Sequence, residues 1–517
     1  MARPQEHLAD ALEILKALQD KGVVAIRSKD LGRLQRERLT RAGFLRPVLK
    51  GWYIPSRPEE SGDRETTSWY AAFWDFCAAY LRFRFGDEWS LSPEQSVLHH
   101  AGNHTVPKQL LVRSPKARNK VTNLAHGASI LEVRAQIAQG NALETIDGLR
   151  LFNLAHALVN ISERFFSSYP MDARTALTGI RDASELLNVL LEGGHNTIAG
   201  RLAGAFRNIG RSRLADDILK TMRAAGYTIS ETDPFADDLR ITLPARERSP
   251  YVNRLHTNWQ SMRDDIIKYF PEPPGLPGDI SAYLKSVDDI YVTDAYHSLS
   301  IEGYRVSEAL IERVRERSWN PESNEADREQ RDAMAARGYW LAFNAVKSSV
   351  EKILNKENPA EVAAEDHGNW YRALFGPSVE AGIVNASDLA GYRNDQVYIR
   401  NSRHVPLNKD AVLDCMPALF DHLREEEDPA VRTVLGYWVF VYIHPYMDGN
   451  GRMGRFLMNA MLASGGYPWT VIPVERRTDY MQALESASVD SNIKPFAKFL
   501  GELVKKCDTP GNLDSSK

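Results

Sequence analysis

Hydrophobic positions in this chain recur mainly at helical spacing, most clearly in the C-terminal half. Apolar side chains three and four positions apart form long runs there, and short polar or proline-containing stretches separate the runs. This pattern is typical of a helical bundle around one core. We expect helices at about 280–302, 325–355, 360–375, 409–424, 428–443, 450–464, 475–488 and 492–505.

The N-terminal residues combine helical and alternating patterns. Residues 5–21 have the apolar spacing of a helix, and residues 43–54 alternate around a turn as a β-hairpin does. Between them we expect a short strand at 23–26 and a helix that Ser28 caps and that runs to Leu34. A third helix carries four arginines, Arg33, Arg36, Arg38 and Arg41. This order resembles a winged helix-turn-helix, with a merely solvated basic helix as the alternative.

Residues 66–245 mix both patterns, so we expect an α/β accessory region after a polar linker at 55–63. An aromatic-rich helix comes first, strands surround Leu110 and Ile130, and helices follow from about 173 to 226.

Two groups of polar residues in this region invite a functional interpretation. The first group is three histidines, His99, His100 and His104. No cysteine or carboxylate lies near them at the spacing of metal ligands, so we expect a loop of solvated histidines rather than a metal site. Its arginines would form a solvated helix face or, alternatively, a second basic surface. The residues concerned are His99, His100 and His104, and Arg201, Arg207, Arg211 and Arg213.

Composition describes a multidomain globular protein. A chain of 517 residues is too long for one core, and 43% hydrophobic with 26% charged residues is ordinary for globular proteins. Cys77, Cys415 and Cys507 lack disulfide or metal spacing, which favours a reducing compartment. The N-terminus lacks the apolar core of a signal peptide, and the longest apolar run is too short to span a bilayer. We therefore expect a cytoplasmic protein without membrane contact.

Charge is distributed unevenly along the chain. Residues 1–57 contain 12 Lys and Arg against 6 Asp and Glu, whereas the whole chain has a net charge of −4. A basic first segment in an acidic chain is a candidate contact for nucleic acid.

A polar, glycine-rich stretch separates the two most apolar predicted helices. It reads His444-Pro-Tyr-Met-Asp-Gly-Asn-Gly-Arg-Met-Gly-Arg455, and apolar runs at 434–443 and 456–463 flank it. Burial gives no reason to gather such polar side chains in a turn. His444 can serve as a general base because the ordinary pKa of histidine lies nearest neutrality. Asp448 offers an oxygen ligand for Mg²⁺.

The remaining residues of this stretch are suited to binding an anion. Gly449, Asn450 and Gly451 allow backbone N–H groups at the start of the next helix to approach a ligand closely. Arg452 and Arg455 are three apart, so they share a helix face and can both reach a polyphosphate. No Gly-Lys-Ser/Thr follows, which excludes a Walker-type phosphate loop. The stretch thus indicates transfer chemistry on a nucleotide phosphate.

The stretch resembles the signature of the Fic family of nucleotidyltransferases, His-Pro-Phe-x-Asp/Glu-Gly-Asn-Gly-Arg-x-x-Arg, from which only Tyr446 departs. The resemblance implies a protein adenylyltransferase in which His444 is the catalytic base and Asp448 holds Mg²⁺. Tyr480 is a further candidate for a contact near the nucleobase, with a packed aromatic residue as the alternative. The residues that would bind ATP are Gly449, Asn450, Gly451, Arg452 and Arg455.

A second segment is similar to the Fic flap, a β-hairpin whose free edge holds a protein target by strand addition. Two short extended arms, 396–400 and 404–407, flank a turn at Asn401. An ordinary surface hairpin is the alternative. The flap residues that would contact the target are Val397, Tyr398, Ile399 and His404.

A third segment, Ser298-Leu-Ser-Ile-Glu-Gly303, matches the inhibitory motif Ser/Thr-x-x-x-Glu-Gly/Asn of one class of Fic proteins. The resemblance implies that Glu302 pairs with Arg455 and occupies the place of the ATP γ-phosphate. A glutamate on a solvated helix end is the alternative. The ending Leu-x-x-Val-x-x-Gly-x-Tyr of the first segment is also similar to the N-terminal domain of AbiEi-type antitoxins.

We therefore expect a mainly α chain. Its parts would be a winged helix-turn-helix at 1–57, an α/β accessory region at 66–245, a Fic helical bundle with a β-hairpin flap at 246–506, and a disordered tail at 507–517.

The expected activity is AMP transfer from ATP to a hydroxyl of a protein target, with autoinhibition by Glu302. One alternative is a Fic enzyme that uses another donor or removes AMP. The other is a DNA-binding regulator or antitoxin-like module whose Fic domain is a sensor. DNA is a candidate partner of residues 1–57, and a homo-oligomer is a further candidate.

Overall fold

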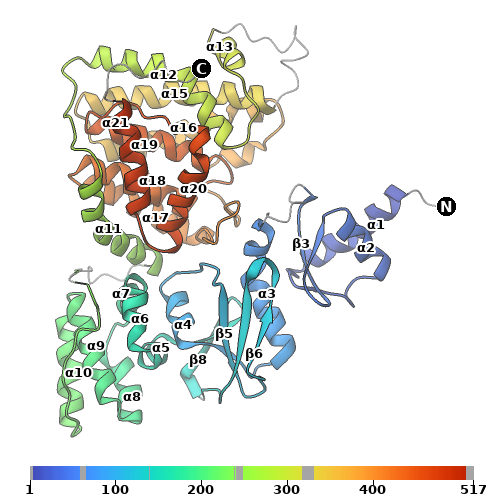
Figure 1. Ribbon diagram of the computed structural model, residues 1–517, viewed down its shortest axis with the longest axis vertical. Coiled ribbons are helices and arrows are strands. Elements are labelled where there is room, and N and C mark those ends of the chain that lie inside the picture. Colours follow the sequence, from blue (N-terminus) through green and yellow to red (C-terminus); the bar gives the residue numbers. More distant parts are fainter. Residues whose placement is uncertain are drawn as a thin grey trace. The chain divides into compact units, whose positions relative to one another are not determined.

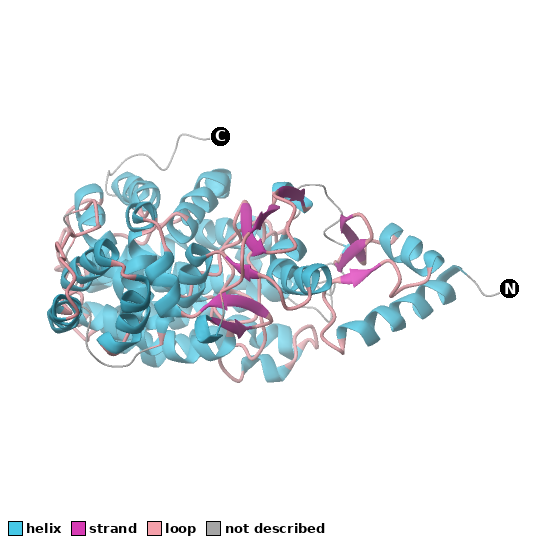
Figure 2. Cartoon of the chain, turned by 90° about the horizontal axis from the view of Figure 1, so that it is seen from below, coloured by secondary structure: helices cyan, strands magenta, loops and turns pink. Residues whose placement is uncertain are grey.

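The computed structural model is mainly helical, and all strands that it describes lie in the N-terminal half (Figures 1 and 2). Contacts divide the chain into two compact units, Met1–Thr257 with Tyr398–Val405, and Asn258–Val397 with Pro406–Lys517. The residues described are 4–58, 66–138, 140–237, 239, 249–316 and 331–507.

The first residues form a small helix-and-sheet module. Helices α1 (Pro4–Gln19) and α2 (Arg33–Arg41) enclose a small core with the antiparallel sheet β1-β3-β2. Its strands are β1 (Ile26–Arg27), β2 (Leu45–Leu49) and β3 (Trp52–Pro55). The predicted first helix, basic helix and hairpin are therefore present.

The predicted helix from Ser28 to Leu34 is wrong. The backbone N–H of Arg27 donates to the Asp30 carboxylate at 2.8 Å, and the Arg27 guanidinium also bonds to it, which closes a turn. Helix α2 begins only after Gly32, whose N–H donates to the Gln35 side chain at 3.0 Å. These local side-chain bonds compete with a helical backbone. The predicted strand at 23–26 likewise shrinks to β1.

An α/β layer follows, as predicted. Helix α3 (Thr67–Phe85) packs its aromatic side chains on the sheet β4-β5-β7-β6, in which β5 and β7 are parallel and the other pairs antiparallel. The pair β8-β9 forms a separate hairpin. The strands are β4 (Ser90–Leu91), β5 (Gln109–Ser114), β6 (Lys120–Asn123), β7 (Ser129–Arg134), β8 (Leu143–Ile146) and β9 (Leu149–Phe152).

Short helices complete the first unit around a second apolar core. They are α4 (Pro93–His100), α5 (Leu154–Asn160), α6 (Glu163–Ser168), α7 (Pro170–Thr178), α8 (Ala183–Gly193), α9 (Asn196–Asn208) and α10 (Ser212–Ala224).

The histidines are not in a solvated loop, contrary to expectation. His99 and His100 lie in α4, and His99 is only 8% exposed because its ring packs against those of Trp74 and His104. Among the residues described, no three His, Cys, Asp or Glu side chains gather as metal ligands would.

The arginines of α9 and α10, and Arg211 between these helices, all have local partners. Arg201 pairs with Glu163, Arg213 approaches Asp217, and Arg207 binds two carboxylates. Arg211 donates to the Ile180 carbonyl at 2.7 Å. Local partners thus offset these charges, which favours the solvated face over a second basic surface.

The second unit is a helical bundle, and α11 (Pro250–Tyr269) leads into it. Helices α18 and α19 are buried along almost their whole length and lie side by side (Figure 1). The other helices are α12 (Ile280–Ile301), α13 (Glu308–Arg315), α15 (Arg331–Leu354), α16 (Pro359–Glu380), α17 (Lys409–Glu425), α20 (Arg477–Val489) and α21 (Lys494–Cys507), and the central pair is α18 (Pro429–Ile443) and α19 (Asn450–Ser464).

Apolar spacing therefore predicted this bundle well, although it missed α13 and the extension of α16 to Glu380. The predicted start of the helix at 325 and the predicted tail beyond Cys507 lie outside the described residues. No helix in the described ranges is long and apolar enough to span a bilayer.

The predicted β-hairpin flap does not form strands. Residues 396–407 contain a turn in which the Ser402 N–H donates to the Ile399 carbonyl at 3.2 Å, but no strand ladder. Polar groups of Asn401 and Arg403 bond instead to other parts of the first unit. Asn401 contacts Thr66 and Thr67, and the Arg403 carbonyl accepts the Val106 N–H at 3.1 Å. These bonds replace the cross-strand bonds that a hairpin would make.

Candidate active site

Helix α18 ends at Ile443, and the backbone of the next residue, His444, adopts the left-handed conformation with φ 56°. The imidazole Nδ1 lies 3.0 Å from the Val441 carbonyl oxygen, so a proton on Nδ1 is needed for this hydrogen bond. Nε2 is then the nitrogen with the free lone pair. Burial lowers the His444 pKa to about 4, which keeps the ring in its neutral, proton-accepting form.

The turn after His444 is held by Asn450. Its side-chain oxygen accepts the Tyr446 N–H at 2.9 Å, and its side-chain nitrogen donates to the Tyr446 carbonyl at 2.8 Å. Gly449 precedes α19 with φ 80°, and a Cβ atom there would lie 2.6 Å from the Phe375 ring. Only glycine fits this position, because both the positive φ and the close ring oppose a side chain.

Arg455 is buried and bonded to the last turn of α12. Its Nη2 donates to Glu302 Oε1 at 2.7 Å, and its Nε donates to the Ser298 hydroxyl at 2.9 Å. A Cβ atom on Gly451 would overlap the Glu302 carboxylate, which therefore lies against the N-terminus of α19. Helix N-termini attract anions, so this carboxylate occupies an anion site.

Both members of this pair are charged. Burial alone would raise the Glu302 pKa, but Arg455 and Arg452 lower it below its ordinary value. Burial opposes the charge on Arg455 in the same way, and Glu302 raises the Arg455 pKa.

Arg452 lies between two aromatic rings. Its guanidinium carbon is 5.0 Å from the centroid of Tyr304 and 4.9 Å from that of Phe375, and its Nη2 reaches Asp448 at 3.4 Å. The sequence patterns did not point to Tyr304 or Phe375. Tyr304 directly follows the segment from Ser298 to Gly303, which was an available signal, whereas Phe375 carried none.

Two buried cationic donors here lack a hydrogen-bond partner within the described part of the chain. They are Nε of Arg452 and Nη1 of Arg455. A buried donor without an acceptor is costly, so these atoms favour a ligand with several anionic oxygens. A polyphosphate satisfies that requirement.

Asp448 is the remaining charged residue of the turn, and its side chain is 61% exposed. Its Oδ1 accepts the Gly449 N–H at 2.6 Å, which orients the carboxylate. Magnesium in nucleotide sites is usually held by one or two carboxylates together with substrate phosphates. Asp448 beside Arg452 fits that arrangement.

Tyr480 is 1% exposed, its hydroxyl contacts that of Tyr437, and its ring stacks near Phe499. This burial favours the packed aromatic over a nucleobase contact. Among the flap residues, Val397 and His404 are buried, whereas Tyr398 and Ile399 are half-buried.

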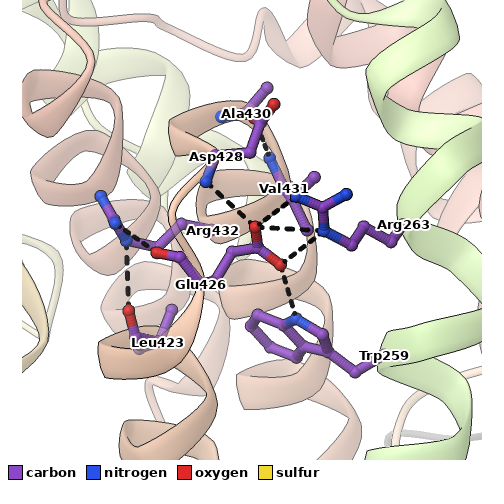
Figure 3. Close-up of polar contacts among 8 residues, drawn as sticks. All are labelled: Trp259, Arg263, Leu423, Glu426, Asp428, Ala430, Val431 and Arg432. Carbon is purple, nitrogen blue, oxygen red and sulfur yellow. Dashed lines mark hydrogen bonds and ion pairs between the residues drawn. The ribbon is translucent and has the colours of Figure 1, made fainter.

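A polar cluster around Glu426 anchors the start of α18 (Figure 3). The buried carboxylate accepts from Trp259 Nε1 at 3.2 Å, from the Arg263 guanidinium at 3.1 Å and from the Asp428 N–H at 3.0 Å. Asp428 in turn caps the first N–H groups of α18. The cluster fixes the beginning of the helix whose other end carries His444.

Residues 354–462 match the sequence model of the Fic/DOC family. Among curated proteins, the chain is 28% identical over 230 residues to the protein adenylyltransferase Fic of Drosophila willistoni, covering 44% of this chain and 42% of that protein. It is 27% identical over 228 residues to the protein adenylyltransferase fic-1 of Caenorhabditis elegans, covering 43% of this chain and 41% of that protein. The chain thus spans less than half the length of the curated relatives it matches.

Two solved structures are also similar. Fic-1 (aa134–508) from C. elegans matches with a TM-score of 0.37 and 18% identity, covering 65% of this chain and 93% of that one. A Fic domain containing signaling protein from Bacteroides thetaiotaomicron VPI-5482 matches with a TM-score of 0.34 and 16% identity, covering 50% and 93%. The motif from His444 to Arg455, which follows α18 and runs into the first turns of α19, lies within the residues that match the Fic/DOC family model.

Proposed function

We propose that this chain transfers AMP from ATP to a hydroxyl group of a protein target. One observation carries the proposal: two buried arginines with unpartnered N–H groups lie at the N-terminus of α19, and the same short turn carries a neutral histidine. The names of the curated relatives, protein adenylyltransferases, support the same reaction.

In this reaction the acceptor hydroxyl loses its proton to Nε2 of His444 while its oxygen bonds to the α-phosphorus. The bond from that phosphorus to the bridging oxygen breaks, and pyrophosphate leaves. Arg452 and Arg455 bind the leaving phosphates, and the N–H groups of Asn450 and Gly451 at the start of α19 bind the α-phosphate, whereas the Gly449 N–H already donates to Asp448. Asp448 would hold Mg²⁺, which when bound supplies positive charge to the phosphate oxygens.

The test is transfer by His444→Ala. A base that acts in the transition state lowers the rate when removed, by about 10²- to 10⁴-fold, and leaves ATP affinity nearly unchanged. Incorporation of label from ATP and ATP binding by calorimetry measure the two quantities. Full transfer by His444→Ala would refute the mechanism.

The same assay separates the rival Fic reactions. The mass added to a modified target distinguishes AMP from UMP and from phosphate. Release of AMP from a previously modified target would identify the reverse activity.

We further propose that Glu302 restrains this activity. Its carboxylate is bonded to Arg455 and lies against Gly451, where a terminal phosphate of ATP would otherwise find both the cation and the helix N-terminus. ATP would then bind only in an unproductive pose until the Glu302–Arg455 pair opens.

We also propose that residues 1–57 contact DNA, chiefly its phosphates. Helix α2 and the β2-β3 hairpin support this, but two of the four arginines already have protein partners. Arg33 pairs with Glu37 at 2.9 Å, and Arg36 donates to the Ser28 carbonyl at 2.6 Å. We therefore assign the phosphate contacts to Arg38 and Arg41.

Such DNA contact is compatible with transfer activity. A chain that binds DNA and transfers no nucleotide would instead be the regulator considered above, with its Fic domain as a sensor. We also propose a cytoplasmic location, because the buried Cys77 and Cys415 are thiols and not part of a disulfide.

A further inference from the structure

Arg393 lies in the irregular segment before α17, and its side chain is almost completely buried, with the residue 4% exposed. Its backbone N–H donates to the Pro445 carbonyl at 2.8 Å, and its Nε donates to the His444 carbonyl at 2.7 Å. One arginine therefore bonds to two successive carbonyl groups at the turn that carries the catalytic base.

The other guanidinium nitrogens extend these bonds in two directions. Nη2 donates to the Leu407 carbonyl and, at 3.4 Å, to the Ile443 carbonyl, while Nη1 donates to the Asp395 carbonyl at 2.9 Å. Asp395 directly precedes the flap segment, and Leu407 is its last residue. The planar guanidinium offers five N–H donors in fixed directions, so it can hold all of these segments in one geometry.

Two physical requirements are met at this position. The last carbonyl groups of a helix have no partner inside the helix, and a cation near them also meets the negative end of the helix dipole. Arg393 supplies both the donors and the charge at the C-terminus of α18.

The bonds also act directly on the backbone of His444. The Ile443 carbonyl belongs to the peptide plane before its Cα atom, and the His444 carbonyl belongs to the plane after it. Holding both planes fixes φ and ψ of His444, which is in the left-handed conformation that residues other than glycine seldom adopt.

We infer that Arg393 is a positioning residue for the proposed AMP transfer: it holds the backbone of His444 so that Nε2 faces the reacting atoms, and it ties that geometry to both ends of the flap segment. The inference rests on the proposed function only through the activity measurement described below.

The positive charge of Arg393 also affects the protonation of His444. After burial itself, the Arg393 guanidinium lowers the His444 pKa, and Glu302 and Asp448 raise it in opposition. The Val441 carbonyl, which accepts from Nδ1, also raises it. Arg393 therefore favours the neutral ring that can accept a proton.

Arg432 offers a matched control at the opposite end of α18. Its guanidinium also donates to backbone carbonyls, those of Glu426 and Leu423, but it does not contact the turn at His444. Arg393→Gln and Arg432→Gln thus each remove an arginine that bonds to backbone near one terminus of the same helix.

The experiment compares these variants in the full-length protein. We expect Arg393→Gln to lower kcat for AMP transfer about 100-fold with KM for ATP within about threefold, because a misplaced catalytic group slows chemistry more than binding. Arg393→Lys should lose most of kcat as well, since an ammonium group keeps the charge but not the planar fork. Arg432→Gln should lower the melting temperature and leave kcat within about threefold. Equal losses of kcat in both Gln variants, or an unchanged kcat in Arg393→Gln, would overturn the inference.

A second readout does not depend on activity. Nitrogen NMR of labelled imidazoles, assigned by comparison with His444→Ala, should show a neutral ring protonated at Nδ1 in the wild type and a mixture of tautomers in Arg393→Gln or Arg393→Lys. An unchanged His444 signal in the variant would overturn the inference. If the wild-type protein transfers no AMP, the proposed function fails and the NMR comparison still decides the role of Arg393.

Discussion

Burial of the His444 imidazole determines the pH range in which this residue can accept a proton. Its pKa falls to about 4, so the neutral base form persists well below the pH at which an exposed histidine becomes charged. We predict that the acid limb of kcat/KM for AMP transfer lies near pH 4 to 5, as measured between pH 4 and 8. A limb centred near pH 6.5 would mean that the ring is solvated in the active state.

The same shift affects stability, with a definite sign. The unfolded chain binds a proton at His444 below about pH 6.5, whereas the folded chain does so only near pH 4. This residue therefore disfavours the folded state progressively as the pH falls from about 6.5 to 4. His444→Ala should flatten that part of a plot of melting temperature against pH, relative to the wild type.

At the scale of elements, the end of α12 and the start of α19 form the proposed brake. Glu302→Gly removes the carboxylate from Arg455 and Gly451, so we predict that AMP transfer rises at least about tenfold, or roughly 1.4 kcal/mol of barrier. Initial rates with saturating ATP measure this effect.

Glu316→Gly is the matched control for that variant. Glu316 occupies the same C-cap position of α13 that Glu302 occupies in α12, but it is exposed. Its replacement should leave the rate unchanged. Equal or lower transfer by Glu302→Gly, with ATP binding intact, would argue against a brake.

The beginning of α18 gives a prediction about stability. Glu426→Ala deprives Trp259 Nε1 and the Asp428 N–H of their acceptor and leaves the Arg263 charge without its partner. We predict a loss of about 2–3 kcal/mol in the free energy of unfolding. Glu427→Ala, at the exposed neighbouring position, should change that free energy by less than about 0.5 kcal/mol. Denaturant titration of both variants checks the difference, and equal effects would contradict the anchoring role.

At the scale of the whole molecule, the basic N-terminal module gives a prediction about partners. Binding of the full chain to duplex DNA should weaken steeply as salt is raised, because phosphate contacts release counterions. Arg38→Gln with Arg41→Gln should weaken binding and reduce the salt slope by about 1 to 2. Arg213→Gln, at a position that is 95% exposed on α10, is the control. Fluorescence anisotropy measures the binding. If no DNA binding is detected even at low salt, we would assign the module to another partner.

The local sequence by itself determined much of this protein. Apolar spacing predicted most helices of the bundle, because a helix that buries one face must repeat its apolar residues at the helical period. The motif from His444 to Arg455 was visible for a similar reason. Its residues are adjacent in the chain, so their chemistry could be inferred before any packing was known.

The tertiary structure decided what depends on contacts between distant residues. Nothing near Phe375 in the sequence predicts that its ring would lie against Arg452, and nothing near Arg393 predicts its bonds to the carbonyls of Ile443 and His444. The predicted flap failed for the same reason. Its polar groups found partners at Thr66, Thr67 and Val106, some three hundred positions earlier, and such partners decide whether a short extended segment becomes a strand. A helix satisfies its own backbone, so its local pattern is a dependable signal, whereas a pair of short arms also depends on the partners that surround it.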